Sequence, residues 1–315
     1  MTVYLEFEKP VAALEARILE LQETADQSDF NVDAEIGKLR AKSDKMLADT
    51  YAKLSPWQKT QVARHPERPH FKNYVADICD HFTMLSGDRA FGDDQAIIGG
   101  LAKIGGRRIV LIGHEKGDDT VSRLRHNFGM GKPEGYRKAI RLMELADRFG
   151  LPVVTLVDTS GAFPGVQAEE RGQAEAIARS TEKCLSLGVP MIACIVGEGG
   201  SGGAVALAAA ERVLMFEHAV YSVISPEGCA SILWRTSDKA ADAAQAMKMT
   251  ASDLQSLGVI DRIVAEPVGG AHRDPALASA NLGRAIGEEL DVLSALSPAE
   301  LRKRRQAKFL AMGTI

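Results

Sequence analysis

Apolar positions repeat at helical spacing near the start of the chain. They stand three or four residues apart and include Val11, Leu14, Ile18 and Leu21. This spacing predicts a helix over residues 10–22, a second helix is expected from about 33 to 54, and a short third one follows Ser55. Residues 1–70 are therefore predicted to form a helical N-terminal extension.

From about residue 95 the pattern changes to short apolar runs rich in β-branched residues, each followed by small residues and then a helix. Near-continuous apolar runs are typical of parallel strands buried on both faces, and the clearest ones span residues 109–112, 153–157 and 191–196. The helices between and after them are predicted over residues 134–149, 168–187 and 204–211. Gly150 is expected just past the end of the first of these helices. The pattern indicates an α/β fold with right-handed crossovers.

The last helix is predicted to begin after Ser297, because Ser297-Pro298-Ala299-Glu300 has the spacing of a capping box. We interpret the basic run 302–305 in that helix as a solvated face. The chain is thus divided into a helical extension (1–70), an α/β domain (71–275) and C-terminal helices (276–315).

Composition and charge narrow the classes of protein. The 315 residues include 38 Lys and Arg against 42 Asp and Glu, so the formal net charge is −4, which does not favour a general nucleic-acid surface. No apolar run approaches the length of a membrane span, and the first residues lack the basic and apolar regions of a signal peptide. We therefore expect a cytoplasmic protein without membrane contact. The four cysteines include no C-x-x-C pair, so no metal site is predicted.

Glycines gather in one place along the chain. There are 29 glycines but only 10 Phe, 2 Trp and 5 Tyr, and five of the glycines lie within residues 197–203, between a predicted strand and a predicted helix. Glycine leaves backbone N–H groups unobstructed, and a helix N-terminus adds the positive end of its dipole. This turn is therefore expected to stabilise a negatively charged oxygen or a phosphate.

A dinucleotide-binding motif fits this turn. Gly197, Gly199 and Gly202 match G-x-G-x-x-G, and Glu217 follows at about the place of a ribose-binding acid. These residues indicate a dinucleotide-binding oxidoreductase. The unit lies far into the chain, however, whereas this fingerprint normally opens its domain.

The turn also matches G-x-S-x-G through Gly199, Ser201 and Gly203. Asp261 and His272 follow in the order of a hydrolase triad, so a serine hydrolase or peptidase that uses Ser201 is a second alternative. A third is an oxyanion hole made of backbone N–H groups without a nucleophile. A non-catalytic scaffold that assembles through the helical extension is a fourth.

Segments spread over almost the whole chain resemble the alpha subunit of bacterial acetyl-coenzyme A carboxylase carboxyltransferases. They span residues 127–130, 133–139, 158–165, 168–173, 197–204, 221–234 and 269–273. The resemblance implies a crotonase-like (ClpP/crotonase) fold, a spiral of strand-strand-helix units, with residues 71–275 as its carboxyltransferase domain. Two departures are Ser160, which stands where proline is expected, and Gly131-Lys132, which replaces a more usual proline-containing pair.

The resemblance also implies an activity and a set of partners. In this family the alpha subunit acts with a beta subunit that bears a zinc ribbon. Together they transfer the carboxyl group from carboxybiotin, held on the biotin carboxyl carrier protein, to acetyl-CoA, which gives malonyl-CoA for fatty acid biosynthesis. ATP is used by another subunit, the biotin carboxylase, and this chain has no G-x-x-x-x-G-K-[ST] loop of its own. The expected assembly is alpha2beta2, with no metal in the alpha chain.

The family pattern places its glycine pair for the biotin ureido oxygen at Gly202 and Gly203, the expected catalytic residues of this chain. The family mechanism lets biotin itself remove the methyl proton, which fits the lack of a compelling acid–base pair here. Further residues are expected to line the substrate sites: Gly161, Ala162, Gly199, Gly200, Ser201, Ala204, Ser225 and Pro226. Of these, Ser225 and Pro226 also fit a helix N-cap followed by proline at the first helical position.

Overall fold

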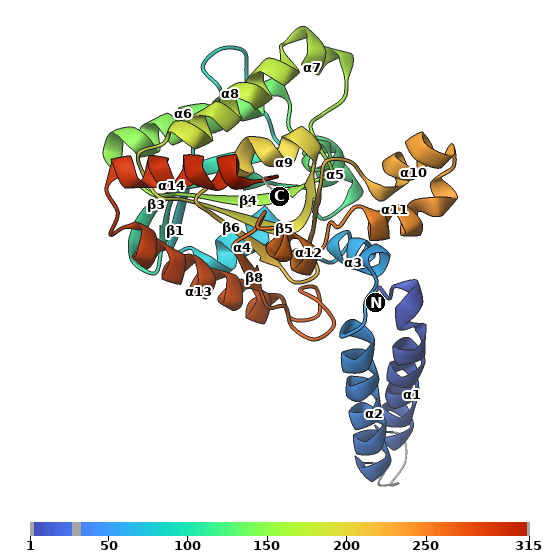
Figure 1. Cartoon of the computed structure of the whole chain (residues 1–315). Helices are drawn as coiled ribbons and strands as arrows, with labels where there is room; N and C mark the ends of the chain where they lie inside the picture. Colours follow the sequence, from blue (N-terminus) through green and yellow to red (C-terminus); the bar gives the residue numbers. More distant parts are fainter. Residues whose placement is uncertain (1–2, 27–32, 314–315) are drawn as a thin grey trace.

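The computed structural model describes residues 3–26 and 33–313, and its centre is one mixed β-sheet (Figure 1). The strands run in the order β1-β2-β3-β4-β5-β6-β8, and β7 pairs with the last residues of β5. Their bounds are β1 His81–Met84, β2 Ile97–Ile104, β3 Arg107–His114, β4 Val153–Thr159, β5 Met191–Gly200, β6 Arg212–Phe216, β7 Val220–Ser222 and β8 Arg262–Val264.

The first three strands are antiparallel, and the pairings from β3 to β8 are parallel. Gly105 and Gly106 make the turn between β2 and β3 with φ of +54° and +81°, a backbone conformation that glycine adopts readily. The predicted parallel sheet is therefore confirmed at the centre and wrong at this edge. A Gly-Gly pair between two apolar runs was the available signal for a hairpin.

Helices cover both faces of the sheet. One face carries α6, α8, α9 and α14, the other carries α4 and α13, and α12 packs against β8 (Figure 1). Their bounds are α4 Phe71–Ile78, α6 Pro133–Phe149, α8 Gln173–Ser186, α9 Ser201–Ala208, α12 Ala251–Ser256, α13 Pro275–Leu293 and α14 Pro298–Ala311. Because both faces are covered, β4 and β5 are buried along their whole length, as their apolar sequences predicted. Gly150 follows α6 with φ of +65°, which confirms its expected place.

The helical extension begins with a two-helix hairpin that projects from the rest of the molecule (Figure 1). It consists of α1 Lys9–Asp26 and α2 Asp33–Tyr51, and α3 Pro56–Ala63 follows after a capping box between Ser55 and Gln58. A separate apolar cluster holds the base of the hairpin: Val11, Leu47, Tyr51, Leu54 and Val62. All three predicted helices of this part are confirmed.

Two predicted helices differ from the observed ones. The helix expected over 168–187 is two, α7 Val166–Glu170 and α8, because Gly172 interrupts it in the left-handed region at φ of +78°. The helix expected over 204–211 is α9, which begins at Ser201. Strand β5 extends to Gly200 because β4 and β7 pair with its last residues from either side. The first glycines of the 197–203 turn are thus strand residues.

The remaining short elements connect these layers. They are η1 Glu6–Glu8, α5 Thr120–Arg125, η2 Asn127–Gly129, α10 Pro226–Trp234, η3 Ser237–Lys239 and α11 Ala240–Ala246. No helix among the described residues is both long and apolar enough to span a membrane.

The capping box that begins α14 is confirmed, but the interpretation of its basic run as a solvated face is wrong for one residue. Arg305 is fully buried, donates to the carbonyl oxygens of Leu187 at 3.0 Å and Val189 at 3.2 Å, and pairs with Glu211. It therefore joins the last helix to the end of α8.

Candidate active site

The glycine turn joins the carboxyl end of β5 to the first turn of α9. Gly202 and Gly203 lie within that first helical turn, where backbone N–H groups have no partner inside the helix. Ser201, the first residue of α9, has a φ of +53°, which turns the chain sharply between strand and helix. Together the turn and the helix dipole make this end of α9 suited to a negatively charged atom.

The backbone of residues 160–162 lies directly against this turn. A Cβ atom on Gly203 would stand 2.6 Å from the carbonyl carbon of Gly161, and one on Gly200 would overlap the carbonyl group of Ser160. A Cβ on Gly202 would meet only the Ile177 side chain, at 3.5 Å, which is ordinary contact. Gly200 and Gly203 are therefore required by the close approach of two backbones, and Gly202 is not.

The 160–165 loop is held by hydrogen bonds on both sides. The Thr159 hydroxyl donates to the carbonyl oxygen of Gly161 at 2.7 Å and accepts from the Gly161 N–H at 3.1 Å. The Gln173 amide donates to the carbonyl oxygens of Gly131 and Phe163, both at 2.9 Å. These bonds fix Gly161 beside the glycine turn.

The expected site residues are brought together to different degrees. Gly161 and Ala162 lie against the run of expected residues from Gly199 to Ala204. Ser225 and Pro226 lie at the start of α10, where the Ser225 hydroxyl caps the helix by accepting from the Gly228 N–H at 3.1 Å. Their connection to the turn runs through β7, which pairs with the end of β5. The expected N-cap is thus confirmed.

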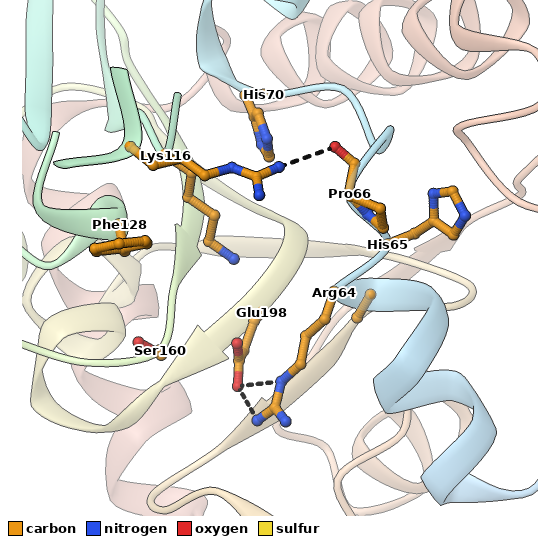
Figure 2. A pocket seen from close by; sticks show the side chains of 10 residues that line it. Arg64, His65, Pro66, His70, Lys116, Phe128, Ser160 and Glu198 are labelled. Carbon is orange, nitrogen blue, oxygen red and sulfur yellow. Dashed lines mark hydrogen bonds and ion pairs between the residues drawn. The ribbon is translucent and has the colours of Figure 1, made fainter. Parts of the chain in front are cut away.

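A pocket of about 240 Å³ opens beside this loop, at the carboxyl edge of the sheet. Lys116, Ser160 and Glu198 line it near the ends of β3, β4 and β5 (Figure 2). Its charged and polar lining includes Arg64, His70, Lys116, Arg123, Ser160 and Glu198. Ser160, one of the two departures from the family pattern, is exposed at this pocket.

A buried carboxylate lies beneath the pocket. Asp158 is 1% exposed, its Oδ1 lies 2.6 Å from Lys116 Nζ and accepts from the Glu198 N–H at 2.9 Å, and its Oδ2 lies 3.4 Å from His70 Nδ1. Burial alone would raise the pKa of Asp158, but Lys116, His70 and the Glu198 N–H outweigh it and hold that pKa well below its usual range. The Asp158 carboxylate is therefore ionised, and these neighbours balance its negative charge.

The negative charge of Glu198, which lines the pocket, is balanced by Arg64 of the helical extension. Glu198 Oε1 accepts from Arg64 at 3.0 and 2.5 Å, and Arg64 also pairs with Glu227 of α10 at 2.6 Å. One arginine after α3 thus joins β5 to α10.

Several of these pocket residues were not predicted from the sequence. Lys116 follows β3 as the glycine turn follows β5, so its place at the carboxyl edge of a parallel sheet was a usable signal. Arg64 and His70 carry no local signal, because only tertiary packing brings residues 64–70 to this edge.

The hydrolase triad is not assembled. Asp261 accepts from the Val213 N–H at 2.7 Å near the amino end of β6, whereas Ser201 follows the carboxyl end of the parallel neighbour β5. The His272 ring stacks on His65 with centroids 3.7 Å apart, and burial lowers the pKa of His272 to about 3. The alternative of a serine hydrolase with these partners is therefore wrong.

The dinucleotide motif is not supported by the local structure either. Gly197 and Gly199 are residues of β5 rather than of an open turn. A Cβ on Gly197 would overlap the Asp158 carboxylate, and one on Gly199 would stand 2.8 Å from the Tyr221 ring. These two glycines allow close packing of side chains inside the fold.

Among the residues that the structure describes, one cluster of possible metal ligands lies elsewhere. Glu8, His65 and His272 each place a ligand atom there, and these atoms lie within 4.8 Å of one another. His65 Nε2 bonds to the Val3 carbonyl oxygen at 3.0 Å, and its Nδ1 accepts from the Glu67 N–H at 3.2 Å. Both ring nitrogens of His65 are thus already used. A metal-free alpha chain stays a prediction.

Comparison with known proteins decides the family. Residues 4–313 match the family described as acetyl co-enzyme A carboxylase carboxyltransferase-like. The chain belongs to this family. A relative from Rhizorhabdus wittichii, named acetyl-coenzyme A carboxylase carboxyl transferase subunit alpha, is 75% identical over 313 residues, which cover 99% of this chain and 100% of the relative. A relative of the same name from Caulobacter vibrioides is 60% identical and covers 98% of this chain and 97% of its own length.

Solved structures of more distant proteins share the fold. The transcarboxylase 12S structure aligns with a TM-score of 0.59 at 20% identity, over 72% of this chain and 42% of its own. A Pseudomonas malonate decarboxylase hetero-tetramer in complex with coenzyme A aligns with a TM-score of 0.60 at 16% identity, over 76% of this chain and 92% of its own. The crotonase-like fold expected of a carboxyltransferase alpha subunit is thereby confirmed.

Proposed function

We propose that this carboxyltransferase alpha subunit binds the biotin side of the reaction at the first turn of α9, with the N–H groups of Gly202 and Gly203 as donors to the ureido oxygen. Its partner would be a beta subunit that bears a zinc ribbon, and the two would transfer the carboxyl group of carboxybiotin to acetyl-CoA. The product is malonyl-CoA for fatty acid biosynthesis.

The chemistry needs fixed donors rather than a side-chain base. Carboxybiotin supplies the carboxyl group, and negative charge then develops on its ureido oxygen. N–H groups held in place at such an oxygen are worth about 10²–10³ in rate each in a well-studied acyl-transfer enzyme. Gly202 and Gly203 lie where α9 leaves such N–H groups free of partners within the helix.

One observation carries the proposal: the backbone of residues 160–162 leaves no room for a Cβ at Gly200 or Gly203, whereas a Cβ at Gly202 would not meet it. This contact holds the turn rigid from one side. A preorganised donor pair loses no reorganisation energy when the charge appears. We expect Gly161, Ala162, Gly199, Gly200, Ser201 and Ala204 to line the same site, and Ser225 with Pro226 to lie at its margin.

The remaining partners follow from the same proposal. Biotin would arrive on the biotin carboxyl carrier protein, and a separate biotin carboxylase would use ATP to carboxylate it. The proposed assembly is alpha2beta2 in the cytoplasm. Its support is the family membership of the chain, since the named relatives are subunits of a carboxylase.

The test is reconstitution. The chain with its beta subunit is expected to form malonyl-CoA from acetyl-CoA and a carboxybiotin donor, and either chain alone is expected to form none. Absence of product from the reconstituted pair would refute the proposal.

A chemical probe separates transfer from hydrolysis. We expect a fluorophosphonate not to label Ser201, and the Ser201→Gly variant to keep its turnover, because glycine tolerates the positive φ at this position. Labelling at Ser201 together with loss of activity would instead support a serine nucleophile.

A further inference from the structure

The pairing of β4 with β5 is irregular just before the glycine turn. Val157 pairs with Ile195, but Thr159 pairs with Gly199, so β5 advances four residues while β4 advances two. Asp158 lies opposite the extra residues. A bulge of this kind bends its strand and redirects the residues that come after it.

The Asp158 side chain takes the place of the missing strand pairing. Its Oδ1 accepts from the Glu198 N–H at 2.9 Å, inside the bulge. The same carboxylate fills the space that a Cβ on Gly197 would need. Asp158 thus contacts β5 where that strand departs from β4, at Glu198, three residues before α9 begins.

A buried negative charge so close to an anion-binding turn would oppose that turn's function unless it were compensated. Lys116 Nζ lies 2.6 Å from Asp158 Oδ1 and supplies the compensating charge. His70 approaches the other oxygen at 3.4 Å. The carboxylate can therefore hold the backbone without repelling an oxyanion at the turn.

We propose that Asp158, paired with Lys116, is a positioning residue: it fixes the bulge at the end of β5 and thereby the direction in which Gly202 and Gly203 present their N–H groups. The inference rests on the proposed oxyanion role of these glycines. It assigns Asp158 no contact with substrate.

The chain offers a matched control at the other end of the same strand. Glu211 is also a buried carboxylate, accepts from the N–H of Met191 at the start of β5 at 3.0 Å, and pairs with Arg305. Glu211→Gln and Asp158→Asn therefore each remove a buried carboxylate that accepts from an N–H group of β5. Only Asp158 lies next to the glycine turn.

The experiment measures kcat, KM and thermal unfolding in the complex reconstituted with the beta subunit. Asp158→Asn keeps an oxygen for the Glu198 N–H but loses the pair with Lys116, so we expect kcat to fall about tenfold. Asp158→Ala loses both contacts, and we expect a fall of about 100-fold, the size of effect that a displacement of about 1 Å produces. KM for both substrates should stay within about twofold. Glu211→Gln should lower the unfolding temperature with kcat unchanged.

Three outcomes would overturn the inference: unchanged kcat in Asp158→Ala, a change confined to KM, or an equal loss of kcat in Glu211→Gln. If Asp158→Ala does not fold, the isosteric Asp158→Asn variant decides alone. An inactive wild-type complex would instead refute the proposed function itself.

Discussion

At the scale of single residues, the glycines of the turn have different tasks. Gly200 and Gly203 admit the backbone of the 160–162 segment, Gly197 admits the Asp158 carboxylate, and Gly202 has room for a methyl group. The sequence located the cluster and its charge preference. It could not separate these tasks, because each depends on a neighbour that is distant along the chain.

Gly203→Ala is expected to reduce both stability and turnover. The new Cβ would stand 2.6 Å from the carbonyl carbon of Gly161, so the 160–162 segment must move. Overpacking of this kind costs about 1–3 kcal/mol of unfolding free energy. Urea unfolding and malonyl-CoA formation measure the two effects, with Gly202→Ala as the control. Equal behaviour of the two variants would show that the close approach does not matter.

At the scale of elements, local sequence patterns predicted the strands and helix ends that neighbouring residues along the chain determine. The central strands, the end of α6 at Gly150 and the capped start of α14 are confirmed. The prediction of parallel strands was wrong at the antiparallel β1–β2 edge. The break at Gly172 and the end of β5 at Gly200 were missed. In β5 the reason is pairing: β4 and β7 extend the strand through glycines that by themselves favour a turn.

The stability of the fold is expected to depend on pH through Asp88, which lies in the loop before β2. Asp88 is buried, which by itself would raise its pKa, but the N–H groups of Ala90, Phe91 and Gly92 and the Arg137 side chain outweigh this and lower the pKa of Asp88 to about 2. Because the folded pKa lies below the usual value for aspartate, its stabilising effect is present above about pH 4 and is lost as pH falls towards 2.

Asp88→Asn should therefore lower stability most at neutral pH, and the difference from the wild type should shrink as the pH falls below 4. Urea unfolding of both proteins between pH 7 and 3 measures it. A difference that does not change with pH would contradict the ionised state of Asp88.

At the scale of the whole molecule, the end of the helical extension reaches the centre of the fold. Arg64 contacts Glu198 in the pocket, and Arg68 donates to the Val196 carbonyl oxygen of β5 at 2.8 Å while pairing with the buried Glu266 at 2.9 and 2.7 Å. The boundaries of the three predicted parts of the chain, residues 1–70, 71–275 and 276–315, stay predictions. The sequence predicted no chemistry for residues 1–70, because contacts between residues so far apart along the chain leave no local pattern.

Arg68→Met is expected to destabilise the chain strongly. It would leave Glu266 buried without its cation, and breaking a buried pair from one side costs about 3–5 kcal/mol. The exposed pair of Arg17 and Glu20 offers the control, since Arg17→Met should change stability by less than about 1 kcal/mol. Denaturant unfolding compares the two variants. Similar small losses would show that the Arg68 pair contributes little.

The central claim is that backbone N–H groups of the glycine turn carry the catalysis, and Gly202 tests it most directly. Proline is tolerated in the first turn of a helix but has no N–H, and alanine at the same position keeps the N–H with its Cβ in ordinary contact with Ile177. In the complex with the beta subunit, we predict that Gly202→Pro forms malonyl-CoA about 10² times more slowly than Gly202→Ala at a similar unfolding temperature. Equal rates for the two folded variants would contradict the claim.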